Sequence, residues 1–238
     1  MASMSNAGDL EALAAMLAGA GFVAAREEAG ELVSRAAGDR KLLDSLVRRR
    51  LTGEPLARRA VERLPAGGTA IDLCTGTGAI ARTLKLGRPE ATVVASDIDP
   101  RAVACATANG VDAYLGDLFA PLPESLQGCV DVVVGAVPYV PTGELPLLQR
   151  DTFTFESRRS YDGGRDGTGI LRRILNEAPR FLRDGGALLL ELGGEQADML
   201  GDDLARLGYA DVDVFSDEDG DVRGIEATLS RAASAGGA

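Results

Sequence analysis

Residues 72–78 read Asp-Leu-Cys-Thr-Gly-Thr-Gly and lie between a short apolar run at 69–71 and a stretch with helical character at 79–86. A strand that leads into a glycine-rich turn and then a helix directs backbone N–H groups at a bound ligand. Glycine allows the sharp turn and leaves no Cβ between backbone and ligand. About twenty residues later, Asp97 follows the apolar run 91–96, where a carboxylate accepts hydrogen bonds from ribose hydroxyls. Together the two segments predict a site for an adenosine-containing cofactor.

The composition narrows the function classes. The chain has 238 residues, 45% of them apolar, and a formal net charge of −11, which suits an α/β domain with a modest extension and disfavours a nucleic-acid partner. Histidine is absent, so Ser–His and Cys–His nucleophile systems are excluded. Three cysteines without a CxxC pair are typical of a reduced cytoplasmic protein and predict no metal site.

The apolar stretch 10–25 does not have the pattern of a secretory signal. Acidic residues Asp9 and Glu11 lie at its start and the first basic residue is Arg26, the reverse of the charge order of such a signal. No apolar run reaches membrane-spanning length. We therefore expect a cytoplasmic protein without a membrane partner; the pattern makes no prediction of oligomeric state.

The chain divides into two regions by its periodicity. Residues 8–52 have helical spacing of leucines, and a further short helix is expected at 55–64. We therefore predict a small N-terminal helical domain with a linker helix at 1–64, an α/β domain at 65–231, and a disordered tail at 232–238.

Strands and helices alternate in the second region. The expected helices and strands imply a mostly parallel Rossmann-like sheet covered on both faces, with an antiparallel hairpin at its C-terminal end. The expected strands are 69–74, 91–96, 111–115, 129–135, 186–192, 210–215 and 224–229, and the expected helices are 78–86, 100–109, 168–182 and 195–207.

Three loops at the carboxyl ends of expected strands carry the predicted cofactor site. Asp97 is assigned to the ribose, and Asp117 in Gly116-Asp117-Leu118 to the adenine amino group. Asp99 precedes Pro100 and is expected to cap a helix rather than to bind ligand.

The spacing Gly76-Thr77-Gly78 resembles the S-adenosylmethionine (SAM) loop of class I methyltransferases, with Cys74 at the place of a usual glycine. The resemblance implies SAM as cofactor and S-adenosylhomocysteine (SAH) as product. The expected cofactor-binding residues are Asp72, Cys74, Thr75, Gly76, Gly78, Asp97, Ile98, Gly116, Asp117 and Leu118.

A fourth loop, 135–141, reads GAVPYVP. Together with the runs GDLF, YDGGRDGTGILRRIL and LRDGGALLLELGGEQ, it resembles the protein-glutamine N5-methyltransferases that act on peptide-chain release factors, which carry Asn-Pro-Pro-Tyr here. The similar region extends over residues 70–229. The resemblance implies SAM-dependent methyl transfer, with Ala136, Val137, Pro138 and Tyr139 at the catalytic position and Tyr139, Glu156 and Arg159 facing the substrate.

Two departures from that family bear on the substrate. Ala136 replaces the family asparagine, which with the next backbone carbonyl holds the target amide; losing one such partner costs about 3 kcal/mol. Val137 replaces the first proline. The family hairpin expected after residue 56 is also missing.

We therefore expect methyl transfer to a nitrogen or oxygen of a small polar metabolite, and a small-molecule substrate in preference to a protein. The alternatives left open are N5-glutamine methylation of a release factor, a SAM-dependent cyclisation or elimination, and a non-catalytic SAM-binding protein.

Overall fold

A computed structural model describes residues 10–15, 26, 29–30, 33–34, 55–148, 157–216 and 220–231. The chain divides into two compact units, Met1–Glu54 and Pro55–Ala238. In the first unit all of the described residues are helical, as expected there. Residues 35–52 of the expected helical stretch and the expected tail 232–238 lie outside the described residues.

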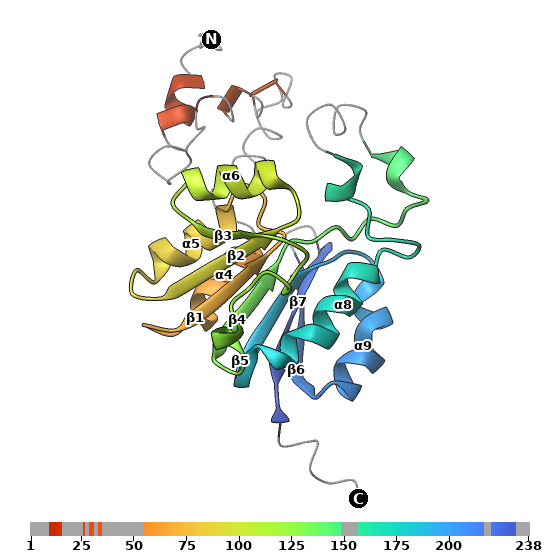
Figure 1. The fold of residues 1–238 in the computed structure, drawn as a ribbon. Coiled ribbons are helices and arrows are strands. Elements are labelled where there is room, and N and C mark those ends of the chain that lie inside the picture. The colour runs from red at the N-terminus through yellow and green to blue at the C-terminus, as the bar shows by residue number, and fades with distance from the viewer. Residues whose placement is uncertain are drawn as a thin grey trace, which may run out of the picture. The chain divides into compact units, whose positions relative to one another are not determined.

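The second unit contains a seven-stranded sheet with the strand order β3-β2-β1-β4-β5-β7-β6 (Figure 1). Its first five strands run parallel, β7 runs antiparallel to β5, and β6 antiparallel to β7. This confirms the expected α/β class and the antiparallel C-terminal pair. The strands are β1 (Thr69–Leu73), β2 (Thr92–Asp97), β3 (Asp112–Leu115), β4 (Val130–Gly135), β5 (Leu182–Glu191), β6 (Tyr209–Ser216) and β7 (Val222–Leu229).

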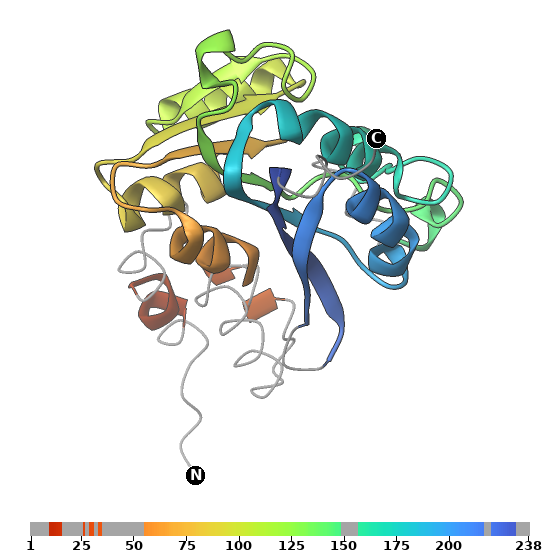
Figure 2. The ribbon, with the colours of Figure 1, turned by 90° about the horizontal axis from the view of Figure 1, so that it is seen from below.

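Helices cover both faces of the sheet because successive strand residues point to opposite sides. Ala70 packs with Leu56 and Leu84 of the helices on one face, whereas Ile71 packs with Leu171 of a helix on the other. Figures 1 and 2 show these two layers. The first layer holds α4 (Pro55–Arg63), α5 (Ala79–Gly87) and α6 (Pro100–Ala108), and the second holds α8 (Gly169–Glu177) and α9 (Gln196–Arg206).

Helix α4 belongs to the sheet unit, which therefore begins at Pro55 and not at residue 65, where the sequence placed the boundary. Leu56, Ala60 and Leu64 are buried against Val132 and Leu189. The helical periodicity of 55–64 made it look like a continuation of the N-terminal helices, but its apolar face is part of the core of the sheet.

Two element ends differ from the expected ones by more than two residues. Strand β5 begins at Leu182 rather than residue 186, because Leu182 pairs with Val130 before the register shifts. Helix α8 ends at Glu177, and a short 3₁₀ turn, Ala178–Arg180, follows. Pro179 in that turn has no N–H to continue the helix.

Because β1 to β5 are parallel, their carboxyl ends lie along one edge of the sheet. The direction of strand order reverses between β1 and β4, and ligands of open α/β sheets bind at such a switch point. Of the helices in the described residues, none is long and apolar enough to span a bilayer.

Candidate functional site

The glycine-rich loop after β1 is held in shape by Asp72. Its side chain is fully buried, and Oδ2 accepts hydrogen bonds from the Thr75 hydroxyl at 2.5 Å and from the Ala81 N–H at 3.0 Å. The second donor belongs to the first turn of α5, where a carboxylate is favoured. Asp72 thus connects the loop to the helix that follows. Because its side chain is buried, it holds the loop in shape from the interior of the protein.

Three residues of this loop have left-handed backbone conformations: Cys74, Gly76 and Gly78, at φ +54°, +57° and +84°. A Cβ on Gly78 would lie 2.8 Å from Val111 Cγ2, so the close packing of α5 requires glycine. A Cβ on Gly76 would meet nothing within 4 Å. Gly76 therefore faces open space, as the backbone of a ligand cradle should.

Asp97, at the end of β2, is fastened to the same loop. Its Oδ2 accepts from the Gly76 N–H and its Oδ1 from the Asp99 N–H, both at 2.9 Å. Each carboxylate oxygen has a second lone pair for a ribose hydroxyl. The next residue, Ile98, is 54% exposed and gives an apolar surface beside that carboxylate.

The expected role of Asp99 as a helix cap is confirmed. Its carboxylate accepts from the Arg101 N–H at the start of α6. The Arg101 side chain and N–H hold the pKa of Asp99 at about 2, and the charge of Arg159 acts in the same direction. Asp99 is thus bound to its own helix rather than turned to the crevice.

The loop after β3 carries a second acid, the exposed Asp117. Leu118 has a left-handed backbone at φ +48°, its side chain is buried in the core, and its carbonyl accepts from the buried Ser96 hydroxyl at 2.7 Å. This anchors the turn and leaves Asp117 exposed. Asp117 Oδ2 accepts from Arg173 Nη2 of α8 at 2.9 Å. Arg173 was not among the residues expected from the sequence.

Acidic residues in or just after β1, β2 and β3 affect the pKa of one thiol, that of Cys74. Burial first, and then the charges of Asp97, Asp72 and Asp117, raise the pKa of Cys74 to about 12, and Arg173 opposes this. Cys74 is therefore protonated at neutral pH and is not a nucleophile.

The loop after β4 presents Tyr139. Val137 is buried in the core, while Ala136, Pro138 and Tyr139 are partly buried. The Tyr139 hydroxyl donates to Glu191 Oε1 at 3.0 Å, and its backbone carbonyl accepts from Gln196 Nε2 at 2.7 Å. Glu191 and Gln196 thus hold this tyrosine at its hydroxyl and at its backbone carbonyl.

A second segment runs beside the Tyr139 loop. The Val140 N–H donates to the Tyr161 carbonyl at 2.9 Å, and the Gly163 N–H donates to the Val140 carbonyl at 2.8 Å. A Cβ on Gly167 would lie 2.2 Å from the Tyr139 carbonyl oxygen. Only glycine therefore permits this close approach, and residues 161–168 form one wall around Tyr139.

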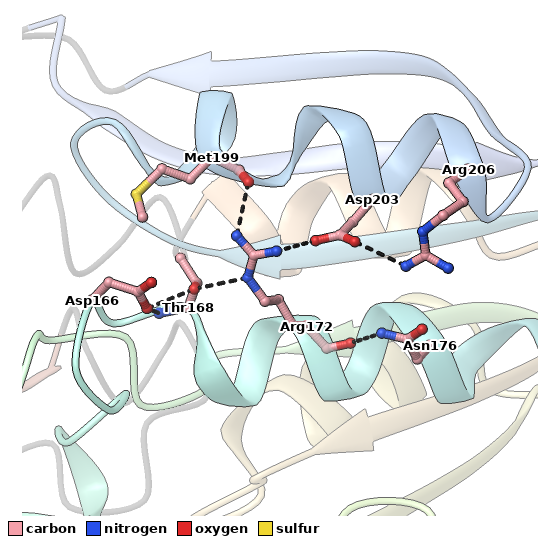
Figure 3. A network of polar contacts seen from close by, with 7 residues as sticks. All are labelled: Asp166, Thr168, Arg172, Asn176, Met199, Asp203 and Arg206. Carbon is pink, nitrogen blue, oxygen red and sulfur yellow. Dashed lines mark hydrogen bonds and ion pairs between the residues drawn. The ribbon is translucent and has the colours of Figure 1, made fainter.

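Arg172 of α8 lies between α8 and α9 and connects both to that wall (Figure 3). Its guanidinium donates to Asp203 of α9, to the Met199 carbonyl at 3.0 Å, and to the Thr168 hydroxyl at 3.1 Å. Thr168 in turn donates to Asp166. Arg172 thus connects both helices of this layer to the segment that contacts Tyr139.

Of the two further substrate-facing residues expected from sequence, Arg159 lies on an exposed 3₁₀ turn, Arg158–Ser160. Its charge contributes to lowering the pKa of Asp99, the residue that caps α6. Glu156 lies outside the described residues. Sequence spacing had no signal for Arg173, Glu191 or Gln196, because their roles depend on contacts across more than fifty residues.

The sequence and the fold of this chain are similar to those of known methyltransferases. Residues 56–118 match the family described as "Methyltransferase small domain". The chain is 34% identical over 173 residues to the release factor glutamine methyltransferase of Geobacter sulfurreducens, covering 70% of this chain and 60% of that one. It is 38% identical over 144 residues to the ribosomal protein uL3 glutamine methyltransferase of Burkholderia pseudomallei, covering 56% and 47%.

Among solved structures, the Mtq2–Trm112 complex of E. cuniculi, described as methylating the eRF1 translation termination factor, aligns with a TM-score of 0.51. That alignment has 26% identity and covers 73% of this chain and 93% of the other. The chain spans about 60% of the length of the first two of the curated relatives and 47% of the third.

The expectation of a small-molecule substrate is wrong. It rested on two local departures, the changed loop at Ala136 and Val137 and the missing hairpin, but the similar proteins are named for methylating proteins: release factors, a ribosomal protein and a termination factor. Two local departures weigh less than similarity over 173 residues.

The chain thus has the fold of class I methyltransferases, and its sequence is similar to those of the release factor glutamine methyltransferases.

Proposed function

We propose that this protein transfers a methyl group from SAM to the side-chain nitrogen of a glutamine in a protein, with a release factor as the first substrate to test. The observation that carries the proposal is that the cofactor-type loops and the Tyr139 loop occupy one edge of one sheet. The 34% identity to a release factor glutamine methyltransferase supports the acceptor.

The residues at the strand ends suit SAM. Asp97 would accept from the ribose hydroxyls, Ile98 would cover one face of the adenine, and Asp117 would accept from the adenine amino group. Gly76 leaves room for the ligand, because nothing lies within 4 Å of a Cβ there. When bound, SAM supplies an electrophilic methyl group on a sulfonium.

On the acceptor side, the protein's contribution is positioning. An amide nitrogen is a weak nucleophile because its lone pair is delocalised into the carbonyl, so its approach must be well aligned. Tyr139, held by Glu191 and Gln196, gives a rigid wall for the flat amide. The backbone carbonyl of Val137 remains as a hydrogen-bond acceptor although Ala136 has no polar side chain.

The direct test uses isotopically labelled SAM with two purified proteins, a release factor carrying a Gly-Gly-Gln motif and ribosomal protein uL3. We expect label on one glutamine, located by mass spectrometry, and no label after that glutamine is replaced by alanine. If SAH binds but neither protein accepts label, glutamine transfer is refuted while cofactor binding stands.

We expect Ala136→Asn to increase the rate of glutamine methylation by at least about 10-fold, because one added partner at a reacting centre is worth up to 10²–10³ in rate. Ala136→Leu is the matched control, since leucine has a similar volume and no hydrogen-bonding group. Single-turnover rates of both variants with saturating SAM provide the measurement. Equal rates in the two variants would show that position 136 does not contact the amide.

A further inference from the structure

Arg173 lies at the predicted adenine end of the crevice. It belongs to α8, and its Nη2 lies 2.9 Å from Asp117 Oδ2 and 3.9 Å from Glu177 Oε1. Its charge also acts on the Cys74 thiol, at the end of β1. The guanidinium therefore lies beside the loop after β3, where the adenine of the nucleoside is expected.

Stability does not account for this ion pair. The Asp117 and Arg173 side chains are 49% and 48% exposed, and such surface pairs contribute about 0–1 kcal/mol. Helix α8 is already anchored by the buried residues Leu171, Ile174 and Leu175 and by the network of Arg172. The more important effect of this ion pair is on the orientation of the Asp117 carboxylate.

An ionised carboxylate only accepts hydrogen bonds. It therefore favours a purine with an amino group at position 6 and disfavours one with an oxo group there. That preference needs a carboxylate with a fixed orientation, and an exposed aspartate alone has free rotation about its χ angles. The hydrogen bond from Arg173 uses Oδ2, which fixes the orientation and leaves Oδ1 for the ligand.

We propose that Arg173 is a positioning residue that sets the cofactor's base selectivity, by holding Asp117 so that its free oxygen accepts from the 6-amino group of adenine. The inference rests on the proposed SAM site and adds a residue to it. Arg173 acts through Asp117 and not by direct contact with the reacting atoms.

The test compares affinities for SAH and for its 6-oxo analogue, S-inosylhomocysteine, by isothermal titration calorimetry. We expect the unmodified protein to prefer SAH by about 10-fold or more, as a hydrogen bond to a charged group implies. Arg173→Gln is expected to reduce this preference to about 3-fold or less, mainly by weakening SAH. Arg173→Lys should restore part of the preference, because an ammonium also donates to Oδ2.

Two controls distinguish a role in base selectivity from the general effect of removing a positive charge. Arg180→Gln removes the same charge from an exposed position in the 3₁₀ turn after α8 and should leave the preference unchanged. Asp117→Asn should abolish the preference, because an amide both donates and accepts, and adding Arg173→Gln to it should change nothing further.

Arg173→Gln would overturn the proposal if it weakened both nucleosides equally, since the arginine would then act only as a charge. Additive losses in the double variant would overturn it as well. If the unmodified protein bound neither nucleoside, the proposed cofactor itself would be wrong. If it bound both with equal affinity, the role of Arg173 in base selectivity would be refuted, while the proposed cofactor site would remain.

Discussion

Cys74 is a non-glycine residue at a place where the backbone is left-handed, at φ +54°. Its side chain packs against the core cluster of α8 and α9, which accounts for the tolerance of cysteine there. The conformation still costs an L-residue about 1–2 kcal/mol. The usual family glycine at this position has no such cost, so the substitution identified in the sequence has a physical consequence in the loop.

We predict that Cys74→Gly has a free energy of unfolding about 1 kcal/mol higher than Cys74→Ala. Both variants remove the thiol, so their difference isolates the backbone conformation. Urea denaturation followed by circular dichroism measures it. A more stable alanine variant would show that the loop relaxes out of the left-handed region.

Asp97 and Asp99 are two residues apart, yet the structure gives them different tasks. Asp97 bonds to Gly76 of the neighbouring loop, and Asp99 bonds to Arg101 of its own helix. We predict that Asp97→Asn weakens SAH binding by at least about 10-fold, because the ribose loses a charged acceptor. Asp99→Asn keeps an equivalent helix cap and should bind SAH normally.

Calorimetric titration of the two variants decides between these roles. Unchanged affinity in Asp97→Asn would remove that residue from the ribose site. Weakened binding in Asp99→Asn would mean that the β2 loop, and not one carboxylate, determines affinity.

At the level of elements, the surroundings of the Tyr139 loop are built from segments that meet only in the folded chain. The segment 157–168 extends beyond the sheet together with residues 140–148, in teal and green in Figure 1. Hydrogen bonds between Val140 and the 161–163 segment hold the two together. Gly167 sits where this wall meets Tyr139 and Gln196, so its lack of a side chain defines the position of the tyrosine.

We predict that Gly167→Ala lowers methyl transfer by at least about 100-fold while SAH affinity changes little, since a 1 Å misplacement at a reacting centre costs that much. Its Cβ would lie 2.2 Å from the Tyr139 carbonyl oxygen and 2.3 Å from Gln196 Nε2. Gly164→Ala is the matched control. Gly164 also has positive φ, +93°, but a Cβ there meets nothing within 4 Å.

Single-turnover rates and SAH titrations of both alanine variants distinguish the steric clash at residue 167 from the backbone strain that both variants share. Equal losses of rate in the two would attribute the effect to backbone strain alone. A rate in Gly167→Ala close to that of the unmodified protein would show that Tyr139 does not need its present position.

The elements differ in how far the sequence predicts them. Apolar runs ending in Asp97 or Gly135 mark strand ends within a residue or two, because buried parallel strands have apolar residues on both faces. The insertion of β7 between β5 and β6 has no such local signal. The same holds for Arg173, since which side of α8 reaches Asp117 depends on how the helix rotates when its buried leucines pack.

At the level of the whole molecule, the extent of the folding unit follows from burial and not from periodicity. Helix α4 places Leu56, Ala60 and Leu64 against the sheet, each at most 1% exposed. Phe215 of β6 belongs to the same cluster. The helical pattern of 55–64 does not distinguish a linker helix from a helix that packs on the sheet. The burial of its apolar face shows that it packs on the sheet.

We predict that a fragment of residues 55–231 folds cooperatively and binds SAH with the affinity of the full chain, because every expected cofactor residue lies within it. A fragment of residues 65–231 should fail to do so. It loses the burial of two leucines and an alanine and exposes their partners, about 4–6 kcal/mol, which is comparable to the total stability of a small domain. Thermal unfolding and SAH titration of both fragments provide the measurement. If the shorter fragment melted and bound like the longer one, α4 would be dispensable and the unit would begin at residue 65 after all.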